Sequence, residues 1–450
     1  MFNKTKIIFA IALTLVMCLT FIPIASADDV PEAKTAAITK LLKVPYNTEL
    51  PNITFKFGIT PKSVDGKTEG DDFDSMPKFD DVSISFDNST KKIARTSIHE
   101  TTPAEDVDYY YVQSGALFAT DKWIHAGLYV YEIKEIDETH GTIESDGSIY
   151  HWSKAAYTVR VYVGNDVGGG FKIDMITTSM NTDDSGETIV DDAQTKVDPT
   201  PGDNPETTGK YSKMIFTNTL VLVNGKNPET NPENPSEIQD RDNWTLYIEK
   251  NVEGNYGDKS HLFDFSIGIK IPSLVPAELT SYTAYIVEPN TSNEEGAPAY
   301  NVVKPITIGS GAINPTAFQL SDNQALVFLK TCVGTRFTVT EDSFGEYTQK
   351  ANVKLNNTSL GEATLSGGAK LSLPGSNFTQ SGSVFGEDSA RMLVVGIKEN
   401  SVVFTNTLTT LPITGLNLND LPFIGMIALV LGSIIVFVAI KARKSKKENQ

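Results

Sequence analysis

The chain has 450 residues and an acidic composition, with 56 Asp and Glu residues against 38 Lys and Arg residues and a formal net charge of -18. This excess of negative charge repels phosphate backbones, so the composition argues against nucleic-acid binding. Hydrophobic residues make up 40% of the chain, and the length exceeds that of one typical domain, so two or more domains are expected.

The first 27 residues have the pattern of a secretory signal peptide. Two lysines precede an apolar run at residues 7–24, and Ala-Ser-Ala at 25–27 forms a small-residue cleavage site. We therefore expect an exported mature chain that starts near Asp28.

The region that follows has the alternating apolar pattern of β-strands. Turn-rich segments separate these strands, which is typical of β-sandwiches, and a short helical stripe near residues 33–42 is the exception. We predict an all-β fold of two tandem Ig-like β-sandwich domains. The clearest alternating stretches are 53–57, 82–86, 129–133, 157–163, 246–248, 263–269 and 337–339.

Two proline-rich segments interrupt the strand pattern. We interpret the acidic segment at 183–209 as a long loop within the first domain, and the Pro-, Asn- and Glu-rich segment at 224–243 as a semi-rigid linker. The predicted domains are then residues 28–223 and 244–410.

Cys332 is the one cysteine outside the predicted signal peptide, because Cys18 lies within it. The mature chain can then form no intrachain disulfide, although export would permit one. Cys332 lies in an apolar stretch, and free cysteines are among the most buried residues, so we expect a packed core thiol.

After the predicted second domain comes Leu411-Pro412-Ile413-Thr414-Gly415. This motif resembles the Leu-Pro-x-Thr-Gly sorting signal of sortase substrates in Gram-positive bacteria. The resemblance implies that a sortase cleaves between Thr414 and Gly415. It would transfer the Thr414 carbonyl to an amine of peptidoglycan or of another protein.

The C-terminal end completes the pattern of such a substrate. Residues 422–440 are almost wholly apolar and long enough to span a bilayer core of about 30 Å as a helix. The basic tail at 441–450 predicts a cytoplasmic end. We expect residues 28–410 to lie outside the cell, and the chain to be in the membrane only before sorting.

The pentapeptide Phe-Thr-Asn-Thr-Leu occurs twice, at 216–220 and 404–408, near the predicted end of each domain. In a strand, the Phe and the Asn two residues later point to the same face, so each Asn carboxamide would lie among core aromatics. A buried amide is costly unless it is hydrogen-bonded. Each half also has a Lys in its first strand and a Glu in a middle strand, which gives the sets Lys40, Glu135 and Asn218, and Lys250, Glu341 and Asn406.

These features resemble the T-antigen-type backbone pilins of Gram-positive bacteria, with their pilin isopeptide-linkage domains. The similar stretches are 127–135, 250–255, 337–342 and the two Phe-Thr-Asn segments ahead of the sorting signal. In that family the Lys amine attacks the Asn carboxamide, ammonia leaves, and an amide bond joins the first strand to the last. The resemblance implies crosslinks Lys40–Asn218 and Lys250–Asn406, with Glu135 and Glu341 as catalytic residues.

The chemistry of these residue types supports the same interpretation. Lysine has an ordinary pKa of about 10.4, and burial among aromatics favours its neutral, nucleophilic form. Burial favours a protonated Glu, which can donate a hydrogen bond to the Asn carbonyl and pass protons to the leaving ammonia. Each set would react once, so we expect no enzymatic turnover. The sequence shows no zinc-ligand spacing or phosphate-binding glycine motif, so no metal or cofactor is predicted.

Alternatives stay open at individual positions. Taken singly, each residue is also compatible with an ordinary surface or turn position, and Lys43 and Lys34 compete with Lys40. In backbone pilins a further lysine near the end of the first domain accepts the Thr carbonyl of the next subunit. Lys210 and Lys213 lie at about that place, although the better-known pilin motif is absent, and strand alternation places Lys213 on the outer face.

We therefore predict a structural cell-surface protein, the backbone subunit of a sortase-polymerised pilus anchored to a Gram-positive cell wall. Its partners would be sortase and peptidoglycan or neighbouring pilin subunits, with minor pilins and host ligands as further partners. The alternative is a monomeric wall-anchored adhesin that binds a host or matrix ligand through the same β-domains. A secreted hydrolase would need a catalytic cluster that the sequence does not show.

Overall fold

The computed structural model describes residues 33–46, 48–93, 106–136, 148–190, 195–202, 211–225, 235–292, 296–311, 315–342, 344–365, 370–373, 392–409 and 421–448. The predicted signal peptide, the sorting signal at 411–415 and Lys210 lie outside these residues. The expectations that concern them stay predictions.

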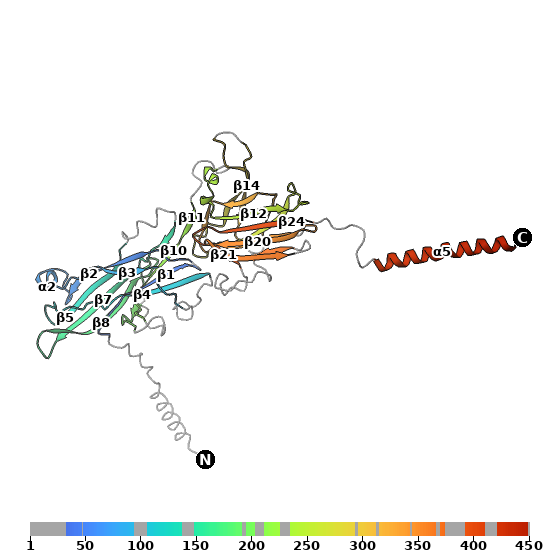
Figure 1. The fold of residues 1–450 in the computed structure, drawn as a ribbon. Coiled ribbons are helices and arrows are strands. Elements are labelled where there is room, and N and C mark those ends of the chain that lie inside the picture. Colours follow the sequence, from blue (N-terminus) through green and yellow to red (C-terminus); the bar gives the residue numbers. More distant parts are fainter. Residues whose placement is uncertain are drawn as a thin grey trace, which may run out of the picture.

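The N-terminal half folds as two β-sheets (Figure 1). One sheet has the strand order β4-β1-β10-β6 and the other has the order β3-β2-β5-β7-β8-β9. The first consists of β1 (Thr39–Pro45), β4 (Val107–Gln113), β6 (Ile149–His151) and β10 (Ile215–Val221). The second consists of β2 (Ile53–Val64), β3 (Val82–Phe86), β5 (Gly127–Glu135), β7 (Ala156–Asn165), β8 (Phe171–Thr182) and β9 (Lys196–Val197).

The core of this half lies between its two sheets. Burial alternates along β2, so that Phe55 and Phe57 face inward. Phe57 packs on Phe216 of β10, with ring centroids 4.8 Å apart. One cluster of buried hydrophobic residues includes members of both sheets, which is the arrangement of a β-sandwich.

The C-terminal half repeats this architecture. Its larger sheet has the order β15-β14-β17-β12-β24-β20-β21, and its smaller sheet has the order β16-β13-β19-β22, with β23 also paired to β19. Phe265 of the smaller sheet packs on Phe404 of the larger, with ring centroids 5.2 Å apart. The larger sheet consists of β12 (Leu246–Glu253), β14 (Ser281–Pro289), β15 (Tyr300–Gly309), β17 (Ala325–Phe328), β20 (Thr348–Leu355), β21 (Thr358–Leu365) and β24 (Ser401–Thr407), and the smaller of β13 (Phe263–Lys270), β16 (Thr316–Leu320), β19 (Arg336–Glu341), β22 (Leu371–Leu373) and β23 (Leu393–Val394).

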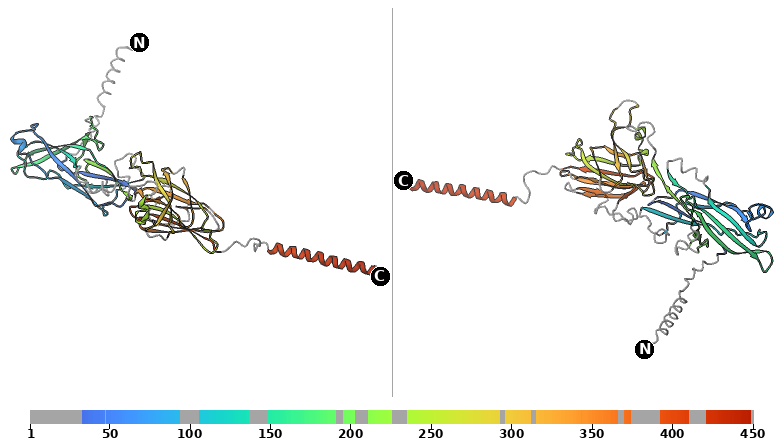
Figure 2. Two further views of the ribbon diagram at one scale, coloured as in Figure 1. Left: turned by 90° about the horizontal axis from the view of Figure 1, so that it is seen from above. Right: turned by 180° about the vertical axis from the view of Figure 1, so that it is seen from behind.

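The all-β prediction is confirmed, and the two sandwiches follow one another in the further views of the molecule (Figure 2). The helical stripe predicted near residues 33–42 is wrong, because β1 begins at Thr39. Leu42 faces the core, whereas Leu41 packs on Tyr109 and Tyr111 on the other side of the sheet. A strand that is buried on both faces loses its alternating pattern, which makes it hard to distinguish from a helix.

The described helices are few. They are α2 (Asp71–Asp74), the 3-10 turns η4 (Ser236–Gln239) and η5 (Arg241–Asn243), and α5 (Leu421–Glu448). Taken over the described residues, no helix is both long and apolar enough to cross a membrane. The span predicted at 422–440 therefore stays a prediction.

In each half the first and the last strand are parallel neighbours. β1 pairs with β10 and β12 pairs with β24, so two segments at opposite ends of each half lie side by side. A parallel pair requires the chain between its strands to cross over, and here that chain forms the rest of the sandwich. Any bond between these two strands would close the whole half.

A short two-stranded sheet joins the two halves. After β10, strand β11 (Val223–Gly225) pairs antiparallel with β18 (Lys330–Cys332) of the C-terminal half. Cys332 is buried at this junction, as predicted. Part of the predicted linker at 224–243 thus belongs to β11, η4 and η5, and the predicted domain bounds stay predictions.

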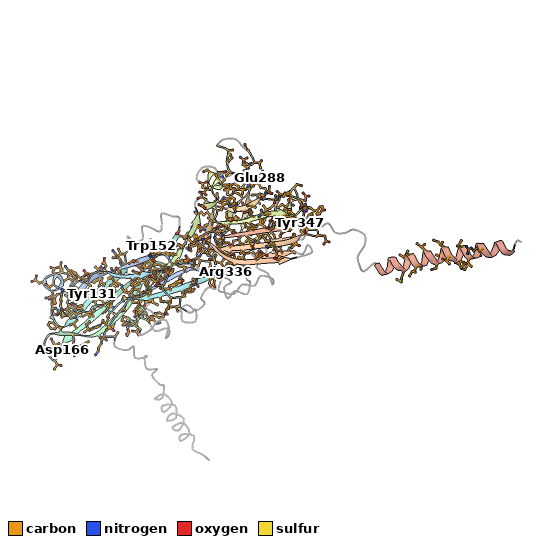
Figure 3. All side chains as sticks on the ribbon, viewed as in Figure 1. Tyr131, Trp152, Asp166, Glu288, Arg336 and Tyr347 are labelled. Carbon is orange, nitrogen blue, oxygen red and sulfur yellow. The ribbon has the colours of Figure 1, made fainter. Side chains whose placement is uncertain are left out.

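Further polar contacts hold this junction. Ser273 donates hydrogen bonds from its N–H and its hydroxyl to the Asp106 carboxylate, at 2.8 and 2.9 Å. The side chain of Arg336 lies at the same junction (Figure 3), with its guanidinium 5.9 Å from the ring centroid of Tyr46. The two sandwiches are therefore in direct contact.

Candidate functional site

The core of the N-terminal sandwich contains a lysine, a glutamate and an asparagine in contact. Lys40 of β1 lies with its Nζ 2.7 Å from Oε2 of Glu135 on β5. Asn218 of β10 donates from Nδ2 to Oε1 of the same carboxyl at 2.6 Å. The Lys40 and Asn218 side chains are fully buried. One carboxyl therefore contacts both the amine and the carboxamide, away from water.

The C-terminal sandwich contains the same three residue types in the same arrangement. Lys250 of β12 lies with its Nζ 2.9 Å from Oε1 of Glu341 on β19. Asn406 of β24 donates from Nδ2 to that same oxygen at 2.7 Å. All three residues are fully buried. The structure thus brings together both predicted sets.

The strand register explains why the lysine and the asparagine meet. Lys40 pairs with Phe216, two residues before Asn218, and Lys250 pairs with Phe404, two residues before Asn406. Residues two apart on a strand share a face, so each lysine and its asparagine are diagonal neighbours on the core face of adjacent strands. The Phe of each pentapeptide sets this register in both halves.

Aromatic rings surround both lysine amines. Lys40 Nζ lies 4.5 Å from the ring centroid of Phe55, and Lys250 Nζ lies 4.3 Å from that of Phe263. Burial lowers the pKa of Lys40 to about 8, although the neighbouring Glu135 opposes this shift. Burial likewise lowers the pKa of Lys250 to about 8, although the neighbouring Glu341 acts to raise it. A neutral, nucleophilic amine is therefore far more accessible here than at a surface lysine.

Glu341 is poised to hold a proton. Burial raises the pKa of its carboxyl, although Lys250 and Asn406 act in the opposite direction. Within the described part of the chain, Glu341 Oε2 and Asn406 Oδ1 have no hydrogen-bond partner. A protonated Glu341 facing a turned carboxamide would satisfy the Asn406 oxygen.

The competing lysines of the N-terminal half lie elsewhere. Lys43 is three residues from Lys40 and so projects from the opposite face of β1, where its Nζ lies 5.9 Å from the Tyr109 ring centroid. Lys34 is exposed. The structure therefore places Lys40 alone of these three beside Glu135.

Lys213 lies two residues before β10, on the outer face of its sheet. It lines a cavity of about 530 Å³ together with Lys43 and Trp152. Its Nζ lies 4.0 Å from the ring centroid of Tyr211, and burial lowers its pKa. An amine in this setting is partly desolvated but still reachable from outside.

Two residues of the first cluster are not predictable from the repeat. Asn218 Nδ2 also donates to the hydroxyl of Tyr150 at 2.6 Å, and Asn218 Oδ1 accepts a hydrogen bond from the backbone N–H of Ser153 at 2.7 Å. Both contacts come from β6 and the turn after it, which have no counterpart in the pentapeptide pattern. A backbone N–H leaves no signature in the sequence at all.

Comparisons with known proteins give the following similarities. A family model described as a domain of unknown function, DUF7601, matches residues 244–369. No curated protein sequence matches the chain.

Among solved structures, the chain is similar to the major pilin of Streptococcus pyogenes at 17% identity, with 84% of this chain and 100% of that chain covered and a TM-score of 0.29. It is similar to the T-13 major pilin of the same organism at 18% identity, with 84% and 98% covered and a TM-score of 0.27. It also resembles a pilus-presented adhesin at 13% identity, over 52% of this chain and 36% of that chain, with a TM-score of 0.18. Function is therefore inferred from the geometry of the two clusters.

Proposed function

We propose that the protein is a structural subunit of a bacterial surface fibre, a pilus backbone, in which each sandwich closes itself with a Lys–Asn amide bond. One observation supports this most strongly. Both halves place a buried lysine and a buried asparagine on adjacent first and last strands, in the same register, with one buried glutamate in contact with both.

The reaction needs only groups that are present in each cluster. The neutral lysine Nζ attacks the asparagine Cγ, and the new N–C bond gives a tetrahedral intermediate. The glutamate accepts a proton from the attacking nitrogen and delivers one to Nδ2. The C–Nδ2 bond then breaks and ammonia leaves, so that no oxidant or cofactor is consumed. Folding supplies the proximity, which contributes about 7–11 kcal/mol in well-oriented intramolecular reactions.

The position of these bonds suits a protein under tension. A pulling force on a sandwich without them would pass through the hydrogen bonds between β12 and β24, which can separate. An amide bond from Lys250 to Asn406 would carry that force through covalent links instead. Asn406 lies near the end of the folded region, so the bond would protect the half next to the predicted sorting signal.

Polymerisation would use the sorting signal at 411–415 and a lysine of the next subunit. We propose Lys213 as that lysine, because its amine is partly desolvated and lines an open cavity. Lys210 is the second candidate. A sortase would form the bond, and peptidoglycan would replace the lysine at the base of the fibre.

Intact mass is the primary test of the crosslinks. The full-length chain is expected to weigh less than its sequence by two molecules of ammonia. Asn218→Ala and Asn406→Ala are each expected to abolish one of these losses. A chain with the unmodified mass would overturn the proposal.

Gel electrophoresis of cell-wall extracts distinguishes the pilus-backbone hypothesis from the monomeric-adhesin hypothesis. A backbone subunit gives a ladder of high-mass bands in denaturing gels, and Lys213→Arg is expected to collapse it. Lys43→Arg, in the same cavity, is the matched control and should leave it intact. A ladder that persists when both Lys210 and Lys213 are replaced would refute the acceptor assignment, and a single wall-linked band would favour the adhesin.

A further inference from the structure

The carboxamide of Asn218 is held in one orientation. The backbone N–H of Ser153 can only donate, so the atom 2.7 Å from it is the carbonyl oxygen of Asn218. The amide nitrogen consequently faces the other way and donates to Glu135 Oε1 and to Tyr150 Oη, each at 2.6 Å. Every polar atom of this carboxamide therefore has a partner before any reaction begins.

We propose that the Ser153 backbone N–H stabilises the oxyanion of the N-terminal crosslinking reaction, and that the Tyr150 hydroxyl positions the departing amide nitrogen. This inference rests on the proposed self-crosslinking. As the lysine Nζ bonds to Cγ, the C=O double bond is lost and negative charge develops on Oδ1. A donor already aimed at that oxygen in a buried site stabilises the transition state more than the ground state.

Ser153 is fixed firmly enough for this role. It is 2% exposed, and its hydroxyl donates to Asp184 Oδ1 at 2.5 Å. The same Asp184 oxygen accepts the N–H of Thr217 at 2.9 Å, and Thr217 is the residue before Asn218. Asp184 thus ties the turn that carries the N–H to the strand that carries the carboxamide.

Tyr150 acts on the other side of the carboxamide. Burial raises the pKa of its hydroxyl, so it stays protonated at neutral pH. When the tetrahedral intermediate forms, Nδ2 becomes pyramidal and its lone pair can accept a hydrogen bond. That single lone pair takes the proton that Glu135 delivers to complete ammonia. The Tyr150 hydroxyl meanwhile continues to accept an N–H of Nδ2 and holds the leaving nitrogen in place.

The C-terminal cluster lacks both devices. Over the described residues, Asn406 Oδ1 has no hydrogen-bond partner, and Asn406 Nδ2 donates to Glu341 Oε1 at 2.7 Å. There the oxyanion depends on Glu341 itself, which as a neutral acid can donate to a turned carboxamide. The two sandwiches therefore differ in how they stabilise the same intermediate, and each provides a control for the other within one molecule.

The test follows the two crosslinks separately in the same chain. Full-length chain that has never folded is assembled by peptide ligation in urea, so that neither amide bond has formed, and is then refolded into detergent. Samples are quenched with acid and digested. Mass spectrometry of the digest then measures the joined peptides Lys40–Asn218 and Lys250–Asn406 over time. Replacing the Ser153 residue by its α-hydroxy acid exchanges the N–H for an ester oxygen and keeps the side chain.

We expect this ester to slow formation of the Lys40–Asn218 bond by about 10²–10³-fold, the usual effect of losing one oxyanion donor. The Lys250–Asn406 bond should form at its unchanged rate. An ester chain in which both bonds form as in the unmodified protein would overturn the proposal. If the unmodified protein itself forms no Lys40–Asn218 bond, the proposed self-crosslinking of that half fails instead, so the two failures are distinct.

Side-chain variants give a second, independent arm. Tyr150→Phe is expected to slow the first bond about tenfold or more and Asp184→Asn to slow it by loosening Ser153, both without effect on the second bond. The matched control is Tyr157→Phe, which removes a buried hydroxyl that contacts the backbone of Ile215 rather than Asn218. Equal slowing by Tyr157→Phe and Tyr150→Phe would show a general packing effect and refute the role of Tyr150.

Discussion

At the scale of single residues, each cluster is a lysine and a glutamate in contact inside an apolar core. The lysine pKa falls to about 8 in both halves because burial outweighs the attraction of the carboxylate. Ion pairs of this kind stabilise a fold poorly, since desolvation offsets their attraction. Their burial is better explained by the proposed crosslinking reaction, which needs a neutral amine.

The Lys250–Glu341 pair predicts a specific pH dependence of crosslink formation. When Lys250 and Glu341 share one proton, they form either an ammonium and a carboxylate or a neutral amine and a carboxylic acid. The ratio of these two forms does not change with pH, because both forms hold the same number of protons. Above the Lys250 pKa of about 8 the last proton is lost, and the amine remains without an acid. We therefore expect a rate that is level between the Glu341 pKa, below which the pair holds two protons and the amine is charged, and about pH 8, and that falls about tenfold per unit above pH 8.

First folding of chain assembled in urea, so that the bond has not yet formed, is started at a series of pH values, and the Lys250–Asn406 peptide is quantified by mass spectrometry to measure this rate. The same measurement would also detect a crosslinking rate that increases with pH. If Glu341 did not act as an acid, only the neutral amine would matter, and the rate would keep rising through pH 8. A rising limb would thus contradict the role given to Glu341.

At the scale of elements, the pairing of first and last strands is the feature that the sequence predicts best. The Phe-x-Asn repeat and the early lysine require two strands in one register, and β1–β10 and β12–β24 have that register. The apolar pattern alone does not predict β1, because Leu41 is covered by tyrosines on the outer face and the alternation is lost. Contacts made by the backbone, such as that of the Ser153 N–H, cannot be predicted from the sequence, because every residue except proline has a backbone N–H.

Removal of one crosslink should weaken its sandwich strongly. Asn406→Ala keeps the strand but removes the electrophile, so the chain between Lys250 and position 406 is no longer closed in the unfolded state. For a loop of more than a hundred residues, closure contributes about 5 kcal/mol to the free energy of unfolding. We expect the free energy of unfolding in urea to fall by about that amount. The intact mass should then show the loss of one ammonia molecule instead of two.

Asn352→Ala is the matched control for this prediction. Asn352 lies on β20, next to β24, and its side chain is exposed. Its replacement should change the free energy of unfolding by less than about 0.5 kcal/mol. Equal effects of the two variants would mean that the bond from Asn406 contributes nothing to the stability of the sandwich.

At the scale of the whole molecule, the junction decides whether two closed sandwiches behave as one rod. Gly334 lies between β18 and β19 with a φ of 84°, and an added Cβ would lie 2.3 Å from Cβ of Pro45 in the other half. Real Cβ atoms do not approach so closely, so only glycine allows this contact. Cys332, two residues earlier, is buried in the same junction, and burial raises its pKa.

Gly334→Ala should therefore open the junction without unfolding either sandwich. Overpacking of this kind costs about 1–3 kcal/mol, which corresponds to an increase of about 10–100-fold in the open population. Cys332 reports this opening, because a buried neutral thiol reacts with a maleimide only when exposed. The measurement is the rate of maleimide labelling at Cys332 in a chain whose Cys18 is replaced by serine.

Gly361→Ala provides the control, since Gly361 has a φ of 109° but no atom within 4 Å of its added Cβ. It introduces the backbone strain without the clash and should leave Cys332 protected. Faster labelling in the Gly334 variant alone would show that the two sandwiches are held together by this contact. Equal labelling of both variants would show that the close contact at Gly334 does not hold the junction closed.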